Sequence, residues 1–276
     1  MKVLIADSGS TKTEWTILQD GNVVRSVFTE GINPNQADEA TIVALLSKSE
    51  LVASSPDQLF FYGSGCGSES GKMIVRNALK AVFKDATVTV ESDLLAAARA
   101  LCHKERGIVA ILGTGASSCL FDGEKIVEHK PSLGFILGDE GSGAVMGKMF
   151  IKKLLYGELP KSVSDAFYTE FGFDKDAILR RVYREAYPNR FLATFGEFIE
   201  RHRSQAAVNE VIRENFKMLI ASHLSAYTDS KKLPIHFIGS IAFHFQEDLH
   251  ALLRWNGYSP GKTERSPMEG LVKYHS

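Results

Sequence analysis

Two segments of the sequence share one pattern, and this internal duplication constrains the fold more than any other feature. In each segment an apolar run leads into a turn rich in glycine and hydroxyl residues, and an Asp-Gly pair follows about ten residues later. The first copy runs from Val3 to Gly21 and the second from Ile108 to Gly123. Both apolar runs are hydrophobic on both faces, as expected for a central strand that is covered on both sides. The duplication predicts two related halves, each built as strand, turn, strand, hairpin and strand.

The turn in each copy has the chemistry of a phosphate-binding loop. Glycine lets the backbone approach a ligand closely, while backbone amides and Ser or Thr hydroxyls supply hydrogen-bond donors to phosphate oxygens. Two ordinary hairpins in unrelated places are the alternative, which the matched pair disfavours. Two such loops could hold one polyphosphate from both sides, so the leading interpretation is a nucleotide-binding protein with two related domains. The candidate phosphate-binding residues are Gly9, Ser10, Thr11, Lys12, Gly113, Thr114 and Gly115.

The order of the predicted elements indicates an α/β fold. Three strands that follow one another directly, and then alternating helices and strands, predict a mixed sheet with helices on its faces. The predicted elements of the first half are strands at 2–7, 13–19, 22–29, 59–62 and 87–90, and helices near 37–50, 69–84 and 93–103.

The second half restarts the same pattern at Ile108 and then contains a long helical region at about 142–230. A late strand at 235–238 and a helix from about residue 240 follow it. We place the domain boundary near 105–107, which gives an N-terminal domain at 1–106 and a C-terminal domain at 107–276. A return of the final residues to the first domain is left open.

Charge and hydropathy narrow the classes of partner. A formal net charge of −1 gives no general attraction to nucleic acid or to an anionic membrane, so phosphate binding must come from local geometry. No apolar run approaches the length of a membrane span, and the N-terminus leads straight into a strand. We expect a cytoplasmic protein without a signal peptide, without a membrane span and without a nucleic-acid partner.

The three cysteines, Cys66, Cys102 and Cys119, include no C-x-x-C pair. This count argues against a disulfide framework and against a zinc or iron–sulfur site within one chain, and leaves open one cluster shared by a dimer. Buried free thiols are predicted.

Three aspartates lie at positions where strands end or helices begin. Asp93 follows a predicted strand and opens a helix, where ligand crevices of α/β sheets form; capping that helix is the alternative. Asp139 has the same two interpretations, and Glu140 is interpreted as a first-turn charge favoured by the helix dipole. Asp7 ends an apolar strand, where a carboxylate is costly to bury unless a cation compensates it. Lys12 or a metal ion could do so, and we favour the metal.

Four motifs, taken in order, carry a resemblance to a known family. They resemble the superfamily of sugar kinases, actin and heat-shock chaperones, and within it the N-acetylglucosamine kinase group of the BadF/BadG/BcrA/BcrD ATPase family. The resemblance covers nearly the whole chain. It implies an α/β fold of two ribonuclease-H-like (actin-type ATPase) domains, with ATP between them and a sugar near the floor of the cleft. The motifs are Asp7-x-Gly9-x-Thr11-Lys12-Thr13, Gly113-Thr114-Gly115-x-Ser117, Gly138-Asp139-Glu140-Gly141-Ser142 and Gly239-Ser240.

The resemblance also implies roles for single residues. Asp7 would hold Mg2+ through water, and Thr11 with Thr114 would bind the ATP phosphates. Gly239 and Ser240 would lie beside the nucleoside. The residues that would contact sugar hydroxyls are Asn35, Asp93 and Asp139, with Asp93 as the catalytic base.

The chain departs from the family in two places. Ser132-Leu133-Gly134 stands where the animal enzymes carry an aromatic residue between two glycines, so Leu133 and Gly134 become candidate substrate-binding residues and the exact sugar is left open. A glycine expected near 203–205, on the adenine side, is also missing.

These features predict an ATP-dependent sugar kinase that acts on an N-acetylated amino sugar, first of all on the 6-hydroxyl of N-acetylglucosamine. N-acetylmuramic acid and glucosamine are the other candidate acceptors. Phosphoryl transfer depends on neutralising phosphate charge and holding the acceptor in line, which two phosphate loops, Mg2+ and one carboxylate could achieve. The resemblance suggests a homodimer.

Two other classes of function are alternatives to the sugar kinase. One is the ATP-hydrolysing activator of a radical 2-hydroxyacyl-CoA dehydratase, which holds an iron–sulfur cluster through cysteines of its second domain; here Cys119 follows the second loop without a convincing partner. The other is a non-catalytic sugar sensor, for which an added DNA-binding module is missing.

Overall fold

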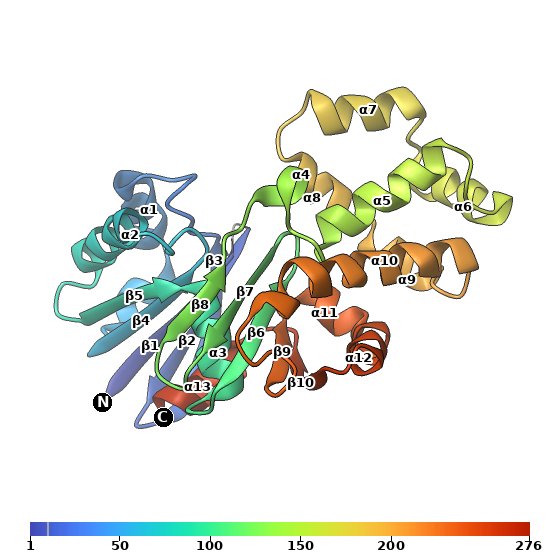
Figure 1. The fold of residues 1–276 in the computed structure, drawn as a ribbon. Helices are drawn as coiled ribbons and strands as arrows, with labels where there is room; N and C mark the ends of the chain where they lie inside the picture. Colours follow the sequence, from blue (N-terminus) through green and yellow to red (C-terminus); the bar gives the residue numbers. More distant parts are fainter. Residues whose placement is uncertain (10) are drawn as a thin grey trace. The chain divides into compact units, whose positions relative to one another are not determined.

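The chain divides into two compact units, each with its own five-stranded sheet (Figure 1). The structure is a computed structural model, and it describes residues 1–9 and 11–276. Unit 1 consists of Met1–Glu105, Gly123–Lys125 and Ser266–Ser276. Unit 2 consists of Arg106–Asp122 and Ile126–Arg265.

The sheet of unit 1 has the strand order β3-β2-β1-β4-β5. Strands β1, β2 and β3 pair antiparallel, whereas β4 and β5 join the other side of β1 in parallel. The carboxyl ends of β1, β4 and β5 therefore lie along the same edge of the sheet. The strands are β1 (Lys2–Ser8), β2 (Lys12–Gln19), β3 (Asn22–Glu30), β4 (Gln58–Gly63) and β5 (Thr87–Ser92).

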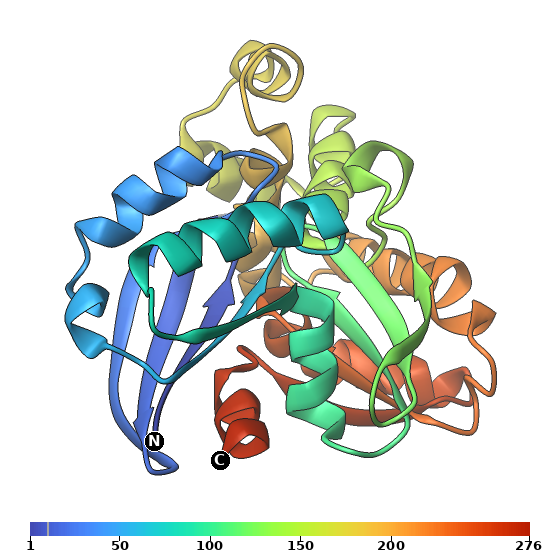
Figure 2. The same ribbon diagram turned by 90° about the vertical axis from the view of Figure 1, so that its left-hand side faces the viewer.

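Helices cover both faces of this sheet (Figure 2). Helices α1 (Glu39–Ser47) and α2 (Glu69–Val82) pack together on one face, with the short 3-10 helix η1 (Glu50–Ser54) beside them. Helices α3 (Asp93–Cys102) and α13 (Met268–His275) pack together on the other. Strand β1 serves both cores, because its alternate residues point to opposite faces. Leu4 and Ala6 pack on the first face, and Val3 and Ile5 on the second.

The sheet of unit 2 repeats this topology with the order β8-β7-β6-β9-β10. Strands β6, β7 and β8 pair antiparallel, and β9 and β10 join in parallel. The α/β class and the internal duplication predicted from the sequence are therefore confirmed. The strands are β6 (Gly107–Leu112), β7 (Ala116–Phe121), β8 (Ile126–Lys130), β9 (Pro234–Ile238) and β10 (Ser259–Glu264).

A long helical region separates β8 from β9 in unit 2. Its core is rich in phenylalanine; the rings of Phe150, Phe167 and Phe198, for example, lie with centroids 5.5 to 5.8 Å apart. The helices are α4 (Gly134–Leu137), α5 (Gly143–Leu155), α6 (Lys161–Phe171), α7 (Lys175–Tyr183), α8 (Pro188–Ala193), α9 (Gly196–Arg201) and α10 (Ala206–Ser222), followed by the short η2 (Leu224–Ala226). Helices α11 (Ser240–His244) and α12 (Gln246–Trp255) follow β9.

The two Asp-Gly pairs form different turns. Asp20 and Gly21 both have positive φ and link β2 to β3 in a two-residue turn, as predicted. The same prediction is wrong for the second pair, because four residues, Asp122–Lys125, connect β7 to β8. Gly123 is the physical reason: with φ +106 its backbone lies so close to Lys104 that a Cβ there would come within 2.4 Å of the Lys104 carbonyl oxygen.

Two expectations drawn from composition can be compared with the fold. All three cysteines are buried thiols, as predicted. Among residues 1–9 and 11–276, no helix is both long and apolar enough to cross a membrane.

Candidate functional site

The first predicted phosphate loop is a tight turn in unit 1. Strand β1 ends at Ser8 and β2 begins at Lys12, and the Gly9 amide donates to the Lys12 carbonyl at 3.0 Å. Thr11 is exposed at the tip of the turn, whereas Ser10 lies outside the described residues. The Lys12 ammonium lies 4.6 Å from the centroid of the Phe28 ring.

Buried hydrogen bonds fix the base of this turn. The Ser8 hydroxyl contacts the Thr13 hydroxyl at 2.6 Å, accepts from the Ile32 amide at 2.9 Å and donates to the Ile32 carbonyl at 3.0 Å. The end of β1 is thereby attached to the chain that leaves β3.

Two carboxylates lie at the carboxyl edge of the unit 1 sheet. Asp7 ends β1, and Asp93 follows β5 directly. Burial above all, together with the carboxylates of Asp93 and Glu14, raises the pKa of Asp7 to about 7, although Lys12 opposes the shift. Burial also raises the pKa of Asp93. The two acidic groups therefore share an environment that favours their neutral forms, or a bound cation.

Asp93 does not cap its helix, so the capping alternative for this residue is wrong. The N-cap of α3 is Ser92, whose hydroxyl accepts from the Leu95 amide at 3.2 Å. Asp93 is the first helical residue, and its Oδ1 accepts from the Leu94 amide at 2.8 Å. Ser92 supplies the cap of α3, which leaves the Asp93 carboxylate available for chemistry.

The predicted sugar ligand Asn35 lies in a turn after β3. Asn33 organises this turn, because its side-chain oxygen accepts from the Asn35 amide at 2.9 Å. A Cβ on Gly65 would come within 2.4 Å of the same Asn33 oxygen, so the turn after β4 packs directly on it. Asn35 itself is exposed. Strand β3 precedes Asn35 and runs in the same direction as β1 and β5, which end next to Asp7 and before Asp93. Asn35, Asp7 and Asp93 therefore lie at one edge of the sheet.

The second predicted phosphate loop, Gly113–Gly115, links β6 to β7 in unit 2. The Gly113 amide donates to the Gly115 carbonyl at 3.0 Å, and Thr114 is exposed at the tip, as Thr11 is in the first loop. The start of α5 holds the loop from behind. The amides of Gly143 and Ala144 donate to the carbonyls of Gly113 and Thr114 at 2.8 and 3.1 Å.

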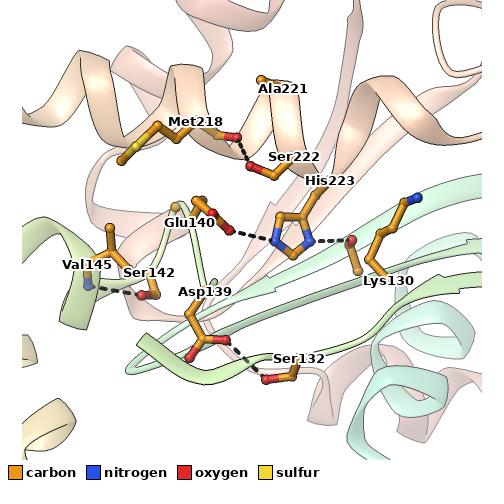
Figure 3. A network of polar contacts seen from close by, with 12 residues as sticks. Lys130, Ser132, Asp139, Glu140, Ser142, Val145, Met218, Ala221, Ser222 and His223 are labelled. Atoms are coloured by element: carbon orange, nitrogen blue, oxygen red, sulfur yellow. Dashed lines mark hydrogen bonds and ion pairs between the residues drawn. The ribbon is translucent and has the colours of Figure 1, made fainter. Parts of the chain in front are cut away.

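Asp139 lies against this second loop and contacts Ser132, as Figure 3 shows for the latter contact. Its carboxylate accepts from the Ser132 hydroxyl at 3.1 Å and from the Ala116 amide, and a Cβ on Gly115 would come within 2.9 Å of its Oδ2. Burial raises the pKa of Asp139. The capping alternative is wrong here too, because Ser142 caps α5.

Glu140 also differs from the prediction. Helix α5 begins at Gly143, so Glu140 precedes the helix instead of lying in its first turn. Its Oε2 pairs with Nε2 of His223 at 3.3 Å.

Two residues beside this segment, His223 and Asn215, were not predicted from the sequence. Asn215 is fully buried on α10, and its side chain bonds the backbone of Gly141 and Ser142 (3.0 and 3.2 Å). One signal could have revealed it: Asn215 falls on the apolar face of α10. A buried amide at such a position needs hydrogen-bond partners.

Leu133 is the N-cap of α4 and Gly134 is its first residue; α4 precedes Asp139. Leu133 is 57 % exposed, and Gly134 has φ +73. Ile136 and Leu137 are also exposed, so this segment presents apolar side chains next to a buried carboxylate.

Gly239 and Ser240, the predicted nucleoside contacts, follow β9. Gly239 has φ +114, and a Cβ there would come within 2.4 Å of the Leu112 carbonyl, so this turn packs on the strand that leads into the second loop.

Beyond this turn, α11 and α12 border a hollow of about 570 Å³. Where the expected glycine is missing, Arg203 pairs with Glu247 at 2.6 Å. The lining residues are Arg203, Phe243, His244, Gln246, Glu247, His250 and Arg254.

No family model matches the chain, and no curated protein matches it. Solved structures do match over nearly its full length. A candidate N-acetylglucosamine kinase from Porphyromonas gingivalis is 42 % identical, with a TM-score of 0.95 over 99 % of this chain and 98 % of that one.

More distant structures share the fold. A candidate N-acetylglucosamine kinase from Chromobacterium violaceum is 16 % identical, with a TM-score of 0.71 over 100 % of this chain and 99 % of that one. A ROK family glucokinase from Streptomyces griseus, solved with glucose and AMPPNP, is 12 % identical, with a TM-score of 0.59 over 99 % of this chain and 98 % of that one. The predicted fold of two actin-type, ribonuclease-H-like domains is confirmed.

Proposed function

Because the chain belongs to the N-acetylglucosamine kinase-like group of the sugar kinase and actin-type ATPase superfamily, we propose that it is an ATP-dependent sugar kinase. It transfers the terminal phosphate of ATP to a hydroxyl of an N-acetylated amino sugar, first of all to the 6-hydroxyl of N-acetylglucosamine. One observation carries the proposal: Asp7 and Asp93 lie at one edge of a sheet whose first hairpin turn is a predicted phosphate loop, and the second predicted loop follows the corresponding strand in unit 2.

Asp93 is the proposed catalytic base. Its Oδ1 is occupied by the Leu94 amide, so we assign the sugar hydroxyl to Oδ2. Burial raises the pKa of this carboxyl group, which makes it a stronger proton acceptor than an exposed aspartate. Asp93 would accept the proton of the sugar hydroxyl while the hydroxyl oxygen attacks the terminal phosphorus of ATP, which makes the hydroxyl a better nucleophile.

The phosphates of ATP are assigned to both loops. Gly9, Thr11 and Lys12 supply donors from unit 1, and Ser10 completes this assignment although it lies outside the described residues. In unit 2 the exposed Thr114 lies between Gly113 and Gly115. Gly239 and Ser240 are assigned to the nucleoside, because their turn packs against the end of β6.

The residues at the sheet edge fit a magnesium ion. Asp7 is buried near two other carboxylates, so a divalent cation there would relieve repulsion that Lys12 offsets in part. Oxygen ligands suit Mg2+, which proteins commonly hold through one or two carboxylates together with substrate phosphates. When bound, the ion neutralises charge on the transferring phosphate; Asp7 is the residue proposed to hold it, through water.

The sugar is assigned to Asn35 and Asp93 in unit 1 and to Asp139, Leu133 and Gly134 in unit 2. Asp139 lies beside the second loop and is the proposed partner of a further hydroxyl. The exposed Leu133 would contact the acetamido region, where a leucine leaves more room than an aromatic ring. N-acetylmuramic acid is therefore a second proposed acceptor, and glucosamine a third.

The dehydratase-activator alternative finds no support in the cysteines. Cys119 lies inside β7 and is fully buried, as Cys66 is in unit 1. Iron analysis of anaerobically purified protein tests this alternative directly. We further propose a cytoplasmic homodimer, which light scattering in solution tests.

A coupled ADP-release assay tests the proposed function. The acceptors to compare are glucose, glucosamine, N-acetylglucosamine, N-acetylmannosamine and N-acetylmuramic acid. We expect the highest kcat/KM with N-acetylglucosamine and slow ATP hydrolysis without sugar. An enzyme that phosphorylates glucose but no acetamido sugar would refute the substrate class, and one that hydrolyses ATP at the same rate with and without every sugar would refute the kinase.

A further inference from the structure

The segment Gly138–Ser142, which carries Asp139, has an unusual backbone. Asp139 has φ 60 and Gly141 has φ 90. A non-glycine residue keeps a left-handed conformation only where the surrounding structure holds it. Helix α10 provides that support, since a Cβ on Gly141 would come within about 3.0 Å of Leu219.

Asn215 fixes this segment at two points. Its Oδ1 accepts from the Gly141 amide at 3.0 Å, and its Nδ2 donates to the Ser142 carbonyl at 3.2 Å. The side chain is fully buried, so water does not replace these bonds. Aspartate at this position could accept but not donate, and leucine could do neither.

His223 contacts the same segment from the end of a chain of three hydrogen bonds. The Lys130 amide contacts the Tyr227 hydroxyl at 3.1 Å, Tyr227 contacts Ser118 at 2.7 Å, and Ser118 contacts Nδ1 of His223 at 3.1 Å. Nε2 of His223 then lies 3.3 Å from the Glu140 carboxylate (Figure 3).

Both ring nitrogens of His223 are engaged. The Lys130 amide donates to the Tyr227 hydroxyl, and the hydroxyls of Tyr227 and Ser118 can each donate or accept, so Ser118 can pair with Nδ1 in either tautomer. Nε2 faces Glu140, so the ring lies between Ser118 and the segment that carries Asp139.

The segment in turn supports the second phosphate loop. Asp139 accepts from Ala116, and the two residues after Ser142 donate to the carbonyls of Gly113 and Thr114. Contacts therefore run without a break from α10 to both the proposed sugar ligand and the loop.

We propose that Asn215 and His223 are positioning residues: through the segment Gly138–Ser142, they hold the Asp139 carboxylate and the loop Gly113–Gly115 in their working geometry. This inference rests on the proposed kinase function. Reacting groups displaced by about 1 Å can cost about 10²-fold in rate, so losing either contact is expected to reduce turnover strongly without unfolding the protein.

Four variants test the proposal. His223→Asn keeps the contact with Ser118 and loses Glu140, whereas His223→Gln can reach Glu140 and is the conservative rescue. Asn215→Asp keeps one of its two bonds, and Asn215→Leu keeps neither. Ser222→Ala is the matched control, because the Ser222 hydroxyl lies on the same helix as Asn215, next to His223, and donates to the Met218 carbonyl.

We expect His223→Asn and Asn215→Asp to lower kcat/KM for the sugar by about 10- to 100-fold at temperatures where circular dichroism shows them folded. His223→Gln should regain much of that loss, and Ser222→Ala should behave as the wild type. The decisive measurement is a double-mutant cycle with Asp139→Asn, in which the further loss from His223→Asn should fall below about threefold.

The same loss in both backgrounds, or wild-type kinetics in His223→Asn and Asn215→Asp, would overturn the proposal. If the wild type phosphorylates no sugar, the proposed function fails instead, and ATP affinity measured by calorimetry then tests the loop. An unchanged affinity in folded Asn215→Leu and Asn215→Asp would overturn the positioning of the loop.

Discussion

Replacing Asp7 by asparagine should stabilise unit 1 at neutral and alkaline pH. The Asp7 carboxyl group has a pKa of about 7 in the folded chain, against an ordinary value of 3.8. Between these values the folded protein holds a proton that the unfolded chain releases. The unfolding free energy therefore falls as the pH rises from about 4 to about 7, and the contribution of protonated Asp7 is lost above that window.

The expected size of the effect follows from the linkage. At about 1.36 kcal/mol for each pH unit, the ionised carboxylate costs up to about 4 kcal/mol at pH 8. Asparagine has nearly the same shape and stays neutral, although its amide donors need partners at a cost of about 1 to 3 kcal/mol. Asp7→Asn should thus gain about 1 to 3 kcal/mol at pH 8 and lose about 1 to 3 kcal/mol at pH 4, where only the cost of the amide remains, while kinase activity falls because the proposed magnesium ligand is lost.

Urea denaturation at several pH values, in EDTA and without nucleotide, measures how the unfolding free energy depends on pH. Trp15 is fully buried in unit 1, so its fluorescence reports on the unit that contains Asp7. Asp85→Asn is the matched control, because Asp85 is an exposed aspartate of the same unit. Equal slopes of stability against pH in wild type and Asp7→Asn, or a less stable variant at pH 8, would refute the argument.

Three further predictions concern the proposed active site. Asp93→Asn should lower turnover by roughly 10²- to 10⁴-fold. The melting temperature should not fall, because Ser92 caps α3 and burial already disfavours the ionised carboxylate of Asp93; retained turnover in a coupled assay would exclude Asp93 as the base. Gly113→Val should lower the affinity for ATP at least about tenfold, as measured by calorimetry, which is a cost of about 1.4 kcal/mol in binding free energy. The fold should tolerate it, because no atom lies within 4 Å of a Cβ there, and unchanged ATP affinity would contradict the loop assignment. N-acetylmuramic acid should be phosphorylated measurably, and Leu133→Trp should depress that activity more than activity on N-acetylglucosamine; equal effects on both sugars would rule out the placement of Leu133.

The central strands and the duplication could be predicted because their signals are local. Val3 to Ala6 and the run that begins at Ile108 are apolar on both faces, which is typical of covered central strands, and the structure places both in the middle of their sheets. The turn at Asp20-Gly21 and the buried cysteines were predictable for the same reason, whereas the contact of Gly123 with Lys104 is not a local signal.

What the sequence did not reveal depends on distant contacts. The Asn215 amide pairs with a backbone 73 and 74 positions away, and Ser118 meets His223 at a separation of 105. No local pattern encodes such pairs. The helix caps show the same limit on a smaller scale: an aspartate and a serine lie side by side at the start of α3, and the backbone geometry selects Ser92.

The discontinuity of unit 1 has a consequence for how the chain folds during synthesis. Helix α13 completes the core around Val3 and Ile5 with Met268 and Leu271. A ribosome must translate about 160 residues of unit 2 before this helix emerges, which takes roughly 10 to 30 seconds at ordinary elongation rates. During that time one apolar face of the first sheet lacks its final cover. The nascent chain is therefore expected to need a chaperone over this face, and a fragment that ends at Glu105 should aggregate where the whole protein does not.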